Sequence, residues 1–242
     1  MTQPKDFCVF SAVPAAPAAW AAAPVPASLV DPLSLRVDGF SSPANPEALG
    51  PAERLTERLW LRAPQASDLA ALHEFHADPA THRYNPGGCL SRLADMEAEL
   101  QRWLLHWQHH GFGYWLVCRR DQPQQVLGVG GIMRKRIDGQ QAMNLHFRFR
   151  PQAWGQGYAA ETSCAALALA FEQLHEAEVL SVVRPANQPA RRTLERVGLR
   201  LIGAWGDVPG QAASLIYEMN EGCYLEQREA GRCCRAGADP GR

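Results

Sequence analysis

The chain has 242 residues, 46% of them hydrophobic and 20% charged, which is the composition of a folded globular protein. Its formal net charge of −1 provides no overall positive field to attract nucleic acid or an anionic membrane. No stretch approaches the roughly 18 apolar residues of a membrane span and no secretory signal is recognisable, so we expect a cytoplasmic protein with neither a membrane nor a nucleic-acid partner.

Three regions differ in composition. Residues 1–53 are rich in Ala, Pro and Ser and have no sustained periodicity, which predicts a disordered extension. The pattern over 54–224 is typical of a folded domain. From Glu221 the sequence turns polar, and we assign 225–242 to a frayed C-terminal tail.

The first half of the domain begins with alternating residues that predict a strand over Arg58–Arg62. Apolar spacing then predicts a short helix over Asp68–Ala77. Turn-forming residues make a loop of Tyr84–Gly88. Ser91 is expected to cap a longer helix, which Gly111 ends.

The second half contains more strands. Three are predicted at Tyr114–Arg119, Val126–Met133 and Ala142–Phe149, the last pair joined by a turn at 138–139. An Ala-rich helical run then covers Glu161–Leu174. A strand, a short helix and two strands complete the domain, at Val179–Val183, Pro189–Val197, Leu199–Trp205 and Ala213–Met219.

The seven cysteines are scattered, odd in number and without C-x-x-C spacing. This pattern is typical of reduced thiols in a cytosolic protein. The histidines also lack the paired spacing of a metal site, so we expect no metal.

The most informative segment is the loop between the predicted strand that ends at Phe149 and the Ala-rich helix. It contains the pattern Gln152-x-x-Gly155-x-Gly157. A loop at the start of a helix offers unpaired N–H groups and the positive end of the helix dipole to an anion. Glycine also removes the side chains that would keep a pyrophosphate away from the backbone.

This loop resembles the acyl-CoA pyrophosphate loop of the GCN5-related N-acetyltransferases (GNAT). Leu55–Arg62 resembles the TERLxLR opening of the RimJ/RimL branch of that superfamily. Gly111–Trp115 and Leu127–Ile132 resemble two of its strands. Asn187–Leu199 is similar to its NxxS…LEKxGF segment. The similarity extends over about 55–220.

The resemblance implies an α/β fold, with a mixed, mostly antiparallel sheet that is split into a V and flanked by helices. It implies an enzyme that transfers an acetyl group from acetyl-CoA to a primary amine by direct attack in a ternary complex. The acceptor would be a protein N-terminus or a small molecule, and dimers are common in this branch.

The resemblance also implies site residues. Tyr84 and Asn85 would line the acceptor side. Asn187 would bind the pantetheine arm, cap the following helix, or do both. The residues implied for binding acetyl-CoA are Phe147, Phe149, Gln152, Trp154, Gly155, Gln156, Gly157, Tyr158, Ala159 and Asn187.

Two residues are candidates for acid–base chemistry. Glu161 lies in the first turn of a helix, where the dipole favours a carboxylate, and its role is either structural or that of a general base or amine-binding group. His146 has an ordinary pKa of about 6.5, which suits a general base, although a strand histidine also serves in packing.

Several positions depart from the family pattern. Leu194 stands where many members have the tyrosine that protonates the leaving thiolate. Ala190 replaces a serine, Asn144 a carboxylate, and His146 a glycine. These departures leave a catalytically degenerate CoA-binding or regulatory module as the alternative function.

Overall fold

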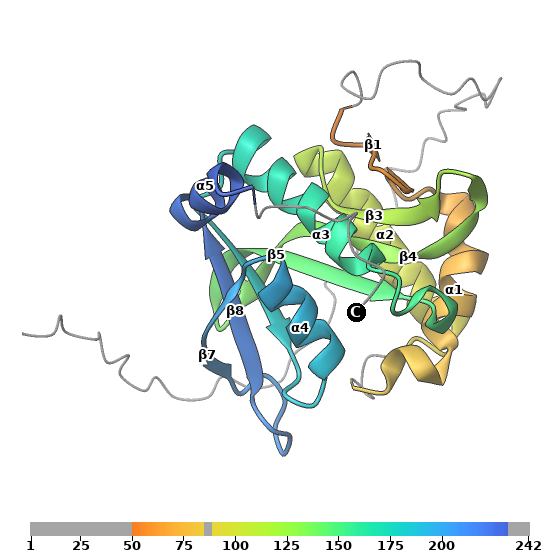
Figure 1. The fold of residues 1–242 in the computed structure, drawn as a ribbon. Coiled ribbons are helices and arrows are strands. Elements are labelled where there is room, and N and C mark those ends of the chain that lie inside the picture. Colours follow the sequence, from red (N-terminus) through yellow and green to blue (C-terminus); the bar gives the residue numbers. More distant parts are fainter. Residues whose placement is uncertain (1–49, 85–88, 232–242) are drawn as a thin grey trace, which may run out of the picture. The chain divides into compact units, whose positions relative to one another are not determined.

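The computed structural model describes residues 50–84 and 89–231. Within these ranges one sheet contains eight strands. They are β1 (Glu53–Leu55), β2 (Leu59–Arg62), β3 (Tyr114–Arg119), β4 (Gln122–Ile137), β5 (Gln140–Phe149), β6 (Glu178–Val183), β7 (Arg200–Trp205) and β8 (Ser214–Asn220). Their order is β1-β2-β3-β4-β5-β6-β8-β7 (Figure 1). Neighbours are antiparallel except β5 and β6, which are parallel.

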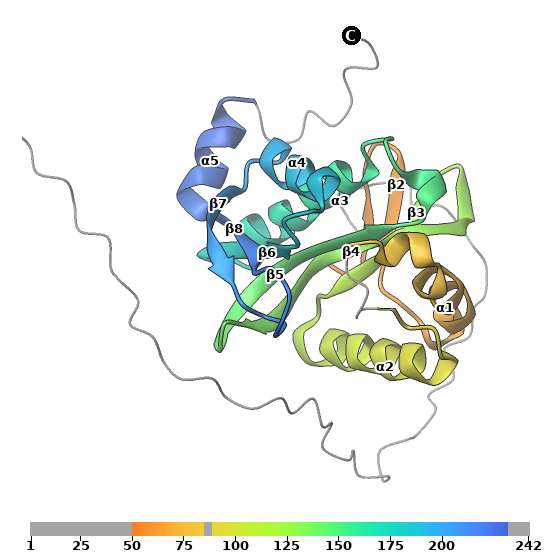
Figure 2. The same cartoon turned by 90° about the horizontal axis from the view of Figure 1, so that it is seen from below.

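Helices cover both faces of this sheet. They are α1 (Leu69–Ala77), α2 (Leu93–His110), α3 (Tyr158–Ala168), α4 (Gln188–Arg196) and α5 (Glu221–Glu229). Figure 2 shows α1 and α2 on one face and α3, α4 and α5 on the other. The expected α/β fold, with a mixed and mostly antiparallel sheet flanked by helices, is confirmed.

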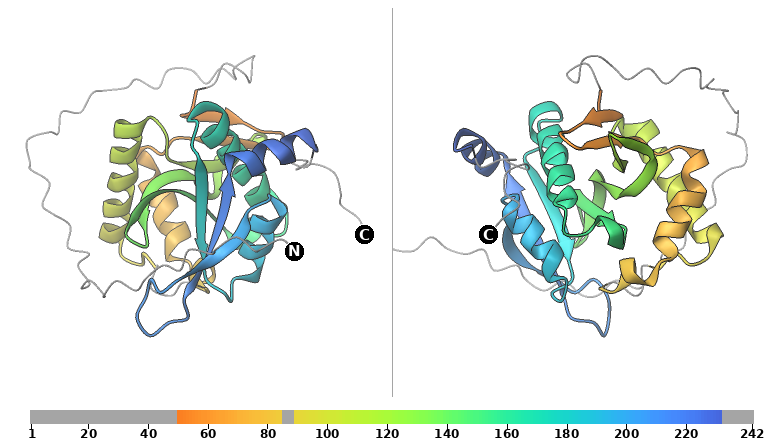
Figure 3. Two further views of the ribbon diagram at one scale, coloured as in Figure 1. Left: turned by 90° about the vertical axis from the view of Figure 1, so that its left-hand side faces the viewer. Right: turned by 45° about the vertical axis from the view of Figure 1, so that its right-hand side comes forward.

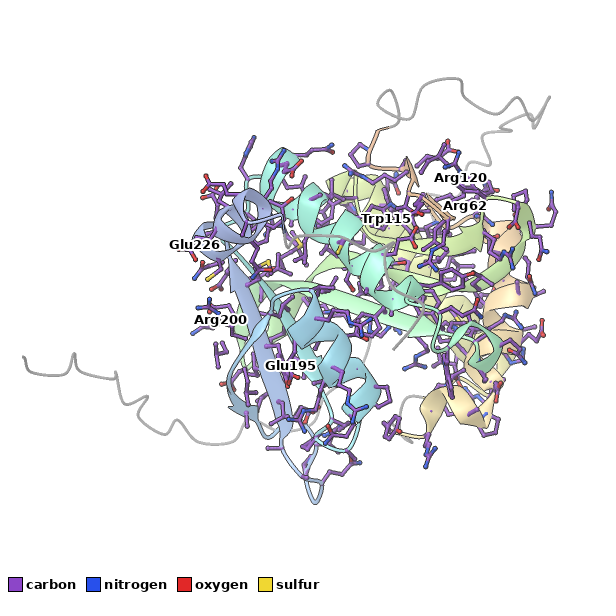
Figure 4. The ribbon with its side chains drawn as sticks, viewed as in Figure 1. Arg62, Trp115, Arg120, Glu195, Arg200 and Glu226 are labelled. Atoms are coloured by element: carbon purple, nitrogen blue, oxygen red, sulfur yellow. The ribbon has the colours of Figure 1, made fainter. Side chains whose placement is uncertain are left out.

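Each face has its own hydrophobic core. The side chains of Met96, Leu100 and Trp103 recur every three or four positions on α2 and pack against β3 and β4. On the opposite face, Trp115 of β3 is fully buried in the core that includes α3 (labelled in Figure 4). Glu195 of α4, also labelled there, accepts a hydrogen bond of 2.8 Å from a β8 tyrosine hydroxyl. Packed side chains therefore cover the sheet on both faces.

The sheet splits between β5 and β6. These strands pair at a single position, Asn144 opposite Leu180, and the Ser181 hydroxyl adds a 3.0 Å hydrogen bond to the Leu145 carbonyl. Beyond these contacts the carboxyl ends of the two strands diverge. Figure 3 shows β6, β8 and β7 as an arm that turns away from the rest of the sheet. This is the V-shaped opening that the resemblance implied.

Some sequence predictions of local structure were wrong. Strand β1 was not predicted, and β4 is much longer than the predicted Val126–Met133. The N-cap of α2 is Arg92 and not Ser91, and no side chain of the described residues caps that helix. The helix after the loop begins at Tyr158, three residues before the predicted start, and its last turn, Leu169–Gln173, widens into a π-helix.

The segment that begins at Glu221 is not frayed, because it forms α5. The reason is tertiary packing. The Tyr224 ring stacks on Phe171 with 4.8 Å between centroids, and its hydroxyl donates to Glu172 at 2.5 Å. A nine-residue polar helix is marginal alone, and here a buried tyrosine anchors it.

Three described cysteines, Cys89, Cys118 and Cys223, carry free thiols, whereas Cys164 is engaged in a disulfide. The prediction of reduced thiols is therefore wrong for Cys164. None of the helices within 50–84 and 89–231 combines the length and hydropathy that a membrane span requires.

Candidate active site

The loop between β5 and α3 presents open backbone N–H groups at the start of a helix. A 3₁₀ turn, Pro151–Ala153, leads into Gly155 and Gly157, whose φ angles of 74° and 79° lie in the left-handed region that favours glycine. Gly157 is the N-cap of α3, and no described side chain caps this helix. The first N–H groups of α3 therefore lack a side-chain acceptor. With the helix dipole behind them, they suit a bound anion.

Side chains hold the loop in this shape. Arg58, the residue before β2, donates from Nη1 to the Gln156 carbonyl at 2.8 Å, and its guanidinium lies 4.8 Å from the centre of the Tyr158 ring. The Gln156 side chain donates to the Gln152 carbonyl, also at 2.8 Å. The predicted loop residues are thus brought together, with the Gln156 side chain bonded to the backbone of Gln152.

The Glu161 carboxylate is fully occupied by the first hairpin. Its Oε1 accepts hydrogen bonds from the Thr56 hydroxyl at 2.6 Å and from the Arg58 backbone N–H at 2.9 Å. Its Oε2 accepts from Arg58 Nε at 2.8 Å and Nη2 at 2.7 Å. Four donors fill the roughly four acceptor positions of a carboxylate. This side chain is 4% exposed, and the arrangement favours the structural alternative for Glu161.

The carboxyl end of β5 presents two different faces. Phe149 belongs to the core on the α3 side, and Phe147 and Ala159 pack against that core. The Trp154 indole N–H donates to the Phe149 carbonyl at 2.8 Å, which ties the loop to the strand end. Side chains alternate along a strand, so His146 lies on the opposite face, towards α1 and α2.

The face of β5 towards α1 and α2 carries polar groups. The Asn144 amide donates to the Tyr114 hydroxyl at 2.7 Å, and the Tyr114 and His146 ring centres are 5.1 Å apart. The Lys135 ammonium lies 5.6 Å from the centre of the same tyrosine ring. The side chain of Arg148 follows on the same face, two residues after His146. Tyr114, Lys135 and Arg148 were not predicted as site residues. Arg148 could have been found from the sequence, because positions 144, 146 and 148 alternate along a predicted strand and therefore share one face.

Burial and nearby positive charge keep His146 neutral. Burial lowers the pKa of His146 well below its usual value, and the charges of Arg148 and Lys135 lower it further. A neutral imidazole has a lone pair with which it can accept a proton.

His76, on α1, is also held neutral and provides a pH-dependent contribution to stability. Burial, reinforced by the charge of Arg148, lowers the pKa of His76 to about 3. In the unfolded chain the imidazole takes up a proton as the pH falls below about 6.5, whereas in the folded chain it stays neutral. The contribution of His76 to the free energy of unfolding is therefore complete above about pH 6.5 and is lost as the pH falls below that value.

We expect the free energy of unfolding to fall by about 1.4 kcal/mol per pH unit below 6.5 through His76 alone. His76→Phe preserves the ring packing against Trp103 and removes this dependence. Urea denaturation of both proteins at several pH values between 4.5 and 7.5 measures the two slopes. Parallel curves for the two proteins would contradict the prediction.

The remaining predicted residues lie apart from the loop. Asn187 is the N-cap of α4, and its Oδ1 accepts a 3.2 Å hydrogen bond from the Ala190 N–H, as the capping alternative required. Leu194 is 1% exposed in the core and offers no proton. Tyr84 lies against the Arg83 guanidinium at 5.6 Å, and Asn85 falls outside the described residues. No group of three or more metal-ligating side chains occurs within 50–84 and 89–231.

Comparison with known proteins agrees with this geometry. The model of the acetyltransferase (GNAT) domain matches residues 58–200, more than half of the chain. YkkB, an uncharacterised protein of Bacillus subtilis (strain 168), is 27% identical over 150 residues, which is 60% of this chain and 83% of YkkB.

Solved structures share the fold. A GNAT-family acetyltransferase from Bacillus anthracis has a TM-score of 0.58 at 21% identity, covering 70% of this chain and 99% of that one. Mycobacterium smegmatis RimJ, solved in complex with CoA-disulfide, has a TM-score of 0.56 at 18% identity, covering 72% and 90%. With the split mixed sheet and the matched family model, the chain belongs to the GNAT family of acetyltransferase enzymes.

Proposed function

We propose that this acetyltransferase transfers the acetyl group of acetyl-CoA to a primary amine, as an N-acetyltransferase of the RimJ/RimL type. The observation that carries the proposal is the glycine loop at the uncapped N-terminus of α3, next to the opening between β5 and β6. Backbone N–H groups there would hold the pyrophosphate. The residues assigned to this contact are Gln152, Trp154, Gly155, Gln156, Gly157, Tyr158 and Ala159.

The pantetheine arm would occupy the opening itself. Beyond Asn144, the edge of β5 that faces β6 has no strand partner among the described residues. The backbone amide at Phe147 is therefore available to pair with the amides of an extended ligand, as a sheet edge pairs with an added strand. At Phe149 the N–H would do so, because the carbonyl accepts from the Trp154 indole. Asn187 borders the other arm of the sheet and would approach the same ligand from α4.

The chemistry requires a neutral amine and a route for its proton. The amine nitrogen attacks the thioester carbon, a C–N bond forms, the C–S bond breaks and the thiolate departs. We assign to His146 the transient acceptance of the amine's proton: its lowered pKa leaves a free lone pair, and because the same lowering makes the imidazolium acidic, the proton passes on to water. The thiolate takes its proton from water, because Leu194 has no hydroxyl. Catalysis then depends mainly on positioning the two reactants.

The wider proposal concerns the setting of the enzyme. Its charge and composition support a cytoplasmic enzyme without a nucleic-acid or membrane partner. The folded enzyme would comprise the predicted 54–224 together with the rest of α5. Both a protein N-terminus and a small-molecule amine fit the proposal at this level, and a homodimer is compatible with it.

The test is acetyl transfer by the purified full-length chain. Acetyl-CoA and a panel of amines and N-terminal peptides are supplied, and the release of free CoA thiol is followed together with the mass of the acetylated product. Initial-rate plots that intersect indicate a ternary complex, whereas parallel lines indicate an acyl-enzyme. Tight acetyl-CoA binding without any product would instead support the degenerate CoA-binding module.

A further inference from the structure

Arg148 occupies a position at which an acceptor would pass. It lies four residues beyond the last bridge between β5 and β6, on the face towards α1 and α2, with His146 two residues before it. Its guanidinium reaches the segment after α1, where Nη1 donates to His82 Nδ1 at 3.2 Å. The arginine is half-buried.

This guanidinium has unused hydrogen-bonding capacity. An arginine side chain carries five N–H donors, and a single one has an acceptor among the described residues. No aspartate or glutamate within 50–84 and 89–231 forms an ion pair with it. Five other arginines that are partly buried do have carboxylate partners: the pairs are Arg58–Glu161, Arg62–Asp68, Arg119–Asp121, Arg150–Glu74 and Arg184–Asp207.

The groups that touch Arg148 do not neutralise its charge. His82 Nε2 hydrogen-bonds the His76 carbonyl, so this nitrogen carries the proton and Nδ1 is the neutral acceptor facing the guanidinium. Burial lowers the pKa of His82 and of His76, which keeps both rings uncharged at neutral pH. A desolvated cation without a counter-ion is unfavourable, and an anionic ligand would relieve that cost.

Charge on the surrounding face has the same sign. Lys135 contributes a second cation beside Tyr114. Glu99 of α2 is the acidic side chain whose charge reaches both Lys135 and Arg148, but its Oε1 accepts from the Trp103 indole and its Oε2 pairs with Arg102. The face therefore presents net positive charge to whatever lies against His146.

Resting on the proposed function, we infer that the acceptor is a small primary amine that carries a carboxylate, and that Arg148 binds this carboxylate while the amine lies beside His146. The planar guanidinium fork matches a carboxylate through two parallel hydrogen bonds. Residues two apart on a strand are roughly 7 Å apart. That separation suits an acceptor of amino-acid size, with the amine and the carboxylate a few bonds apart.

The experiment compares matched acceptors with the full-length enzyme: phenylalanine, phenylalaninamide and phenethylamine. The amide is a weaker base than the acid and is more readily a neutral nucleophile, so amine reactivity alone does not favour the acid. We expect kcat/KM for the acid to exceed that for the amide at least tenfold. Arg148→Gln is expected to lower kcat/KM for the acid about 10- to 100-fold and to change the other two by less than threefold.

Two further variants make the result specific. Arg148→Lys keeps the charge without the fork and is expected to fall between wild type and Arg148→Gln. Arg136→Gln removes the same charge from an exposed position near the β4–β5 turn and is expected to leave selectivity unchanged. Equal losses with all three acceptors, or a raised KM for acetyl-CoA with selectivity intact, would overturn the inference. So would a wild-type preference for the amide or for N-terminal peptides.

A binding measurement separates this inference from the proposed function. Phenyllactate retains the carboxylate and has a hydroxyl in place of the amine, so calorimetry in the presence of CoA reports carboxylate recognition without transfer. Binding to wild type at least tenfold tighter than to Arg148→Gln supports the inference even if no amine is acetylated. If Arg148→Gln does not fold, phenyllactate against phenyllactamide on the wild type decides the question, and equal affinity would reject it.

Discussion

Gly155→Glu is expected to raise the dissociation constant for acetyl-CoA at least 100-fold. The substitution places a carboxylate among the N–H groups that we assign to the pyrophosphate, so like charges meet at the N-terminus of α3. At 100 times its dissociation constant, acetyl-CoA stabilises wild type by about 2.7 kcal/mol, which raises the melting temperature of a domain of this size by roughly 5–11 °C. The variant is expected to show almost none of that increase.

Gly139→Glu is the matched control. Gly139 has a φ angle of 80°, Gly155 one of 74°, and a β-carbon at either position meets nothing within 4 Å. The two substitutions therefore impose the same strain of about 1–2 kcal/mol. Gly139 lies in the turn between β4 and β5, away from the loop, so its variant is expected to melt earlier but to retain the full acetyl-CoA shift. Equal shifts in both variants would place the cofactor elsewhere.

The loop could be predicted from the sequence because its determinants are local. Gly155 and Gly157 are close to each other and lie just before the helical run, so the sequence indicated a glycine loop at a helix start, although it placed that start three residues too late. The strands that alternate or run apolar, such as Tyr114–Arg119, were likewise predicted correctly, because strand periodicity is a property of a short window.

The surroundings of Glu161 and Arg148 could not be predicted in this way. Thr56 and Arg58 are 105 and 103 residues from Glu161 in the chain, and His82 is 66 residues from Arg148. Nothing in a single sequence specifies such pairs. The helix α5 likewise depends on a long-range contact, because Tyr224 packs on Phe171 and bonds Glu172 in the π-helical turn after α3. Its polar composition, taken alone, indicated a tail.

These long-range pairs affect the assignment of catalytic roles more than they affect the fold. The sequence offered both Glu161 and His146 as candidates for a base, each beside a structural alternative. The structure surrounds Glu161 with four donors from the β1–β2 hairpin, and it places His146 on a partly buried polar face near the cations of Arg148 and Lys135. A site-directed experiment can therefore distinguish a structural carboxylate from a residue that takes part in transfer.

Glu161→Ala is expected to lower the free energy of unfolding by about 3 kcal/mol, or roughly 6–12 °C in melting temperature. The variant leaves the Thr56 hydroxyl and the Arg58 N–H without their acceptor and removes the ion pair that joins the first hairpin to α3. The estimate is set below the full value for a buried pair because the Arg58 side chain is 39% exposed and can be solvated. Differential scanning calorimetry measures the change.

Activity distinguishes a structural role for Glu161 from a catalytic one. Glu161→Gln retains the shape and one acceptor oxygen, and we expect it to recover part of the lost stability. If Glu161 only supports the loop, transfer at a temperature where both variants are folded falls less than tenfold, mainly through a raised KM for acetyl-CoA, because Arg58 also holds the Gln156 carbonyl. A proton acceptor would instead show kcat reduced by 100-fold or more in both variants, with KM unchanged. That second outcome would return the carboxylate to the catalytic role and displace His146 from it.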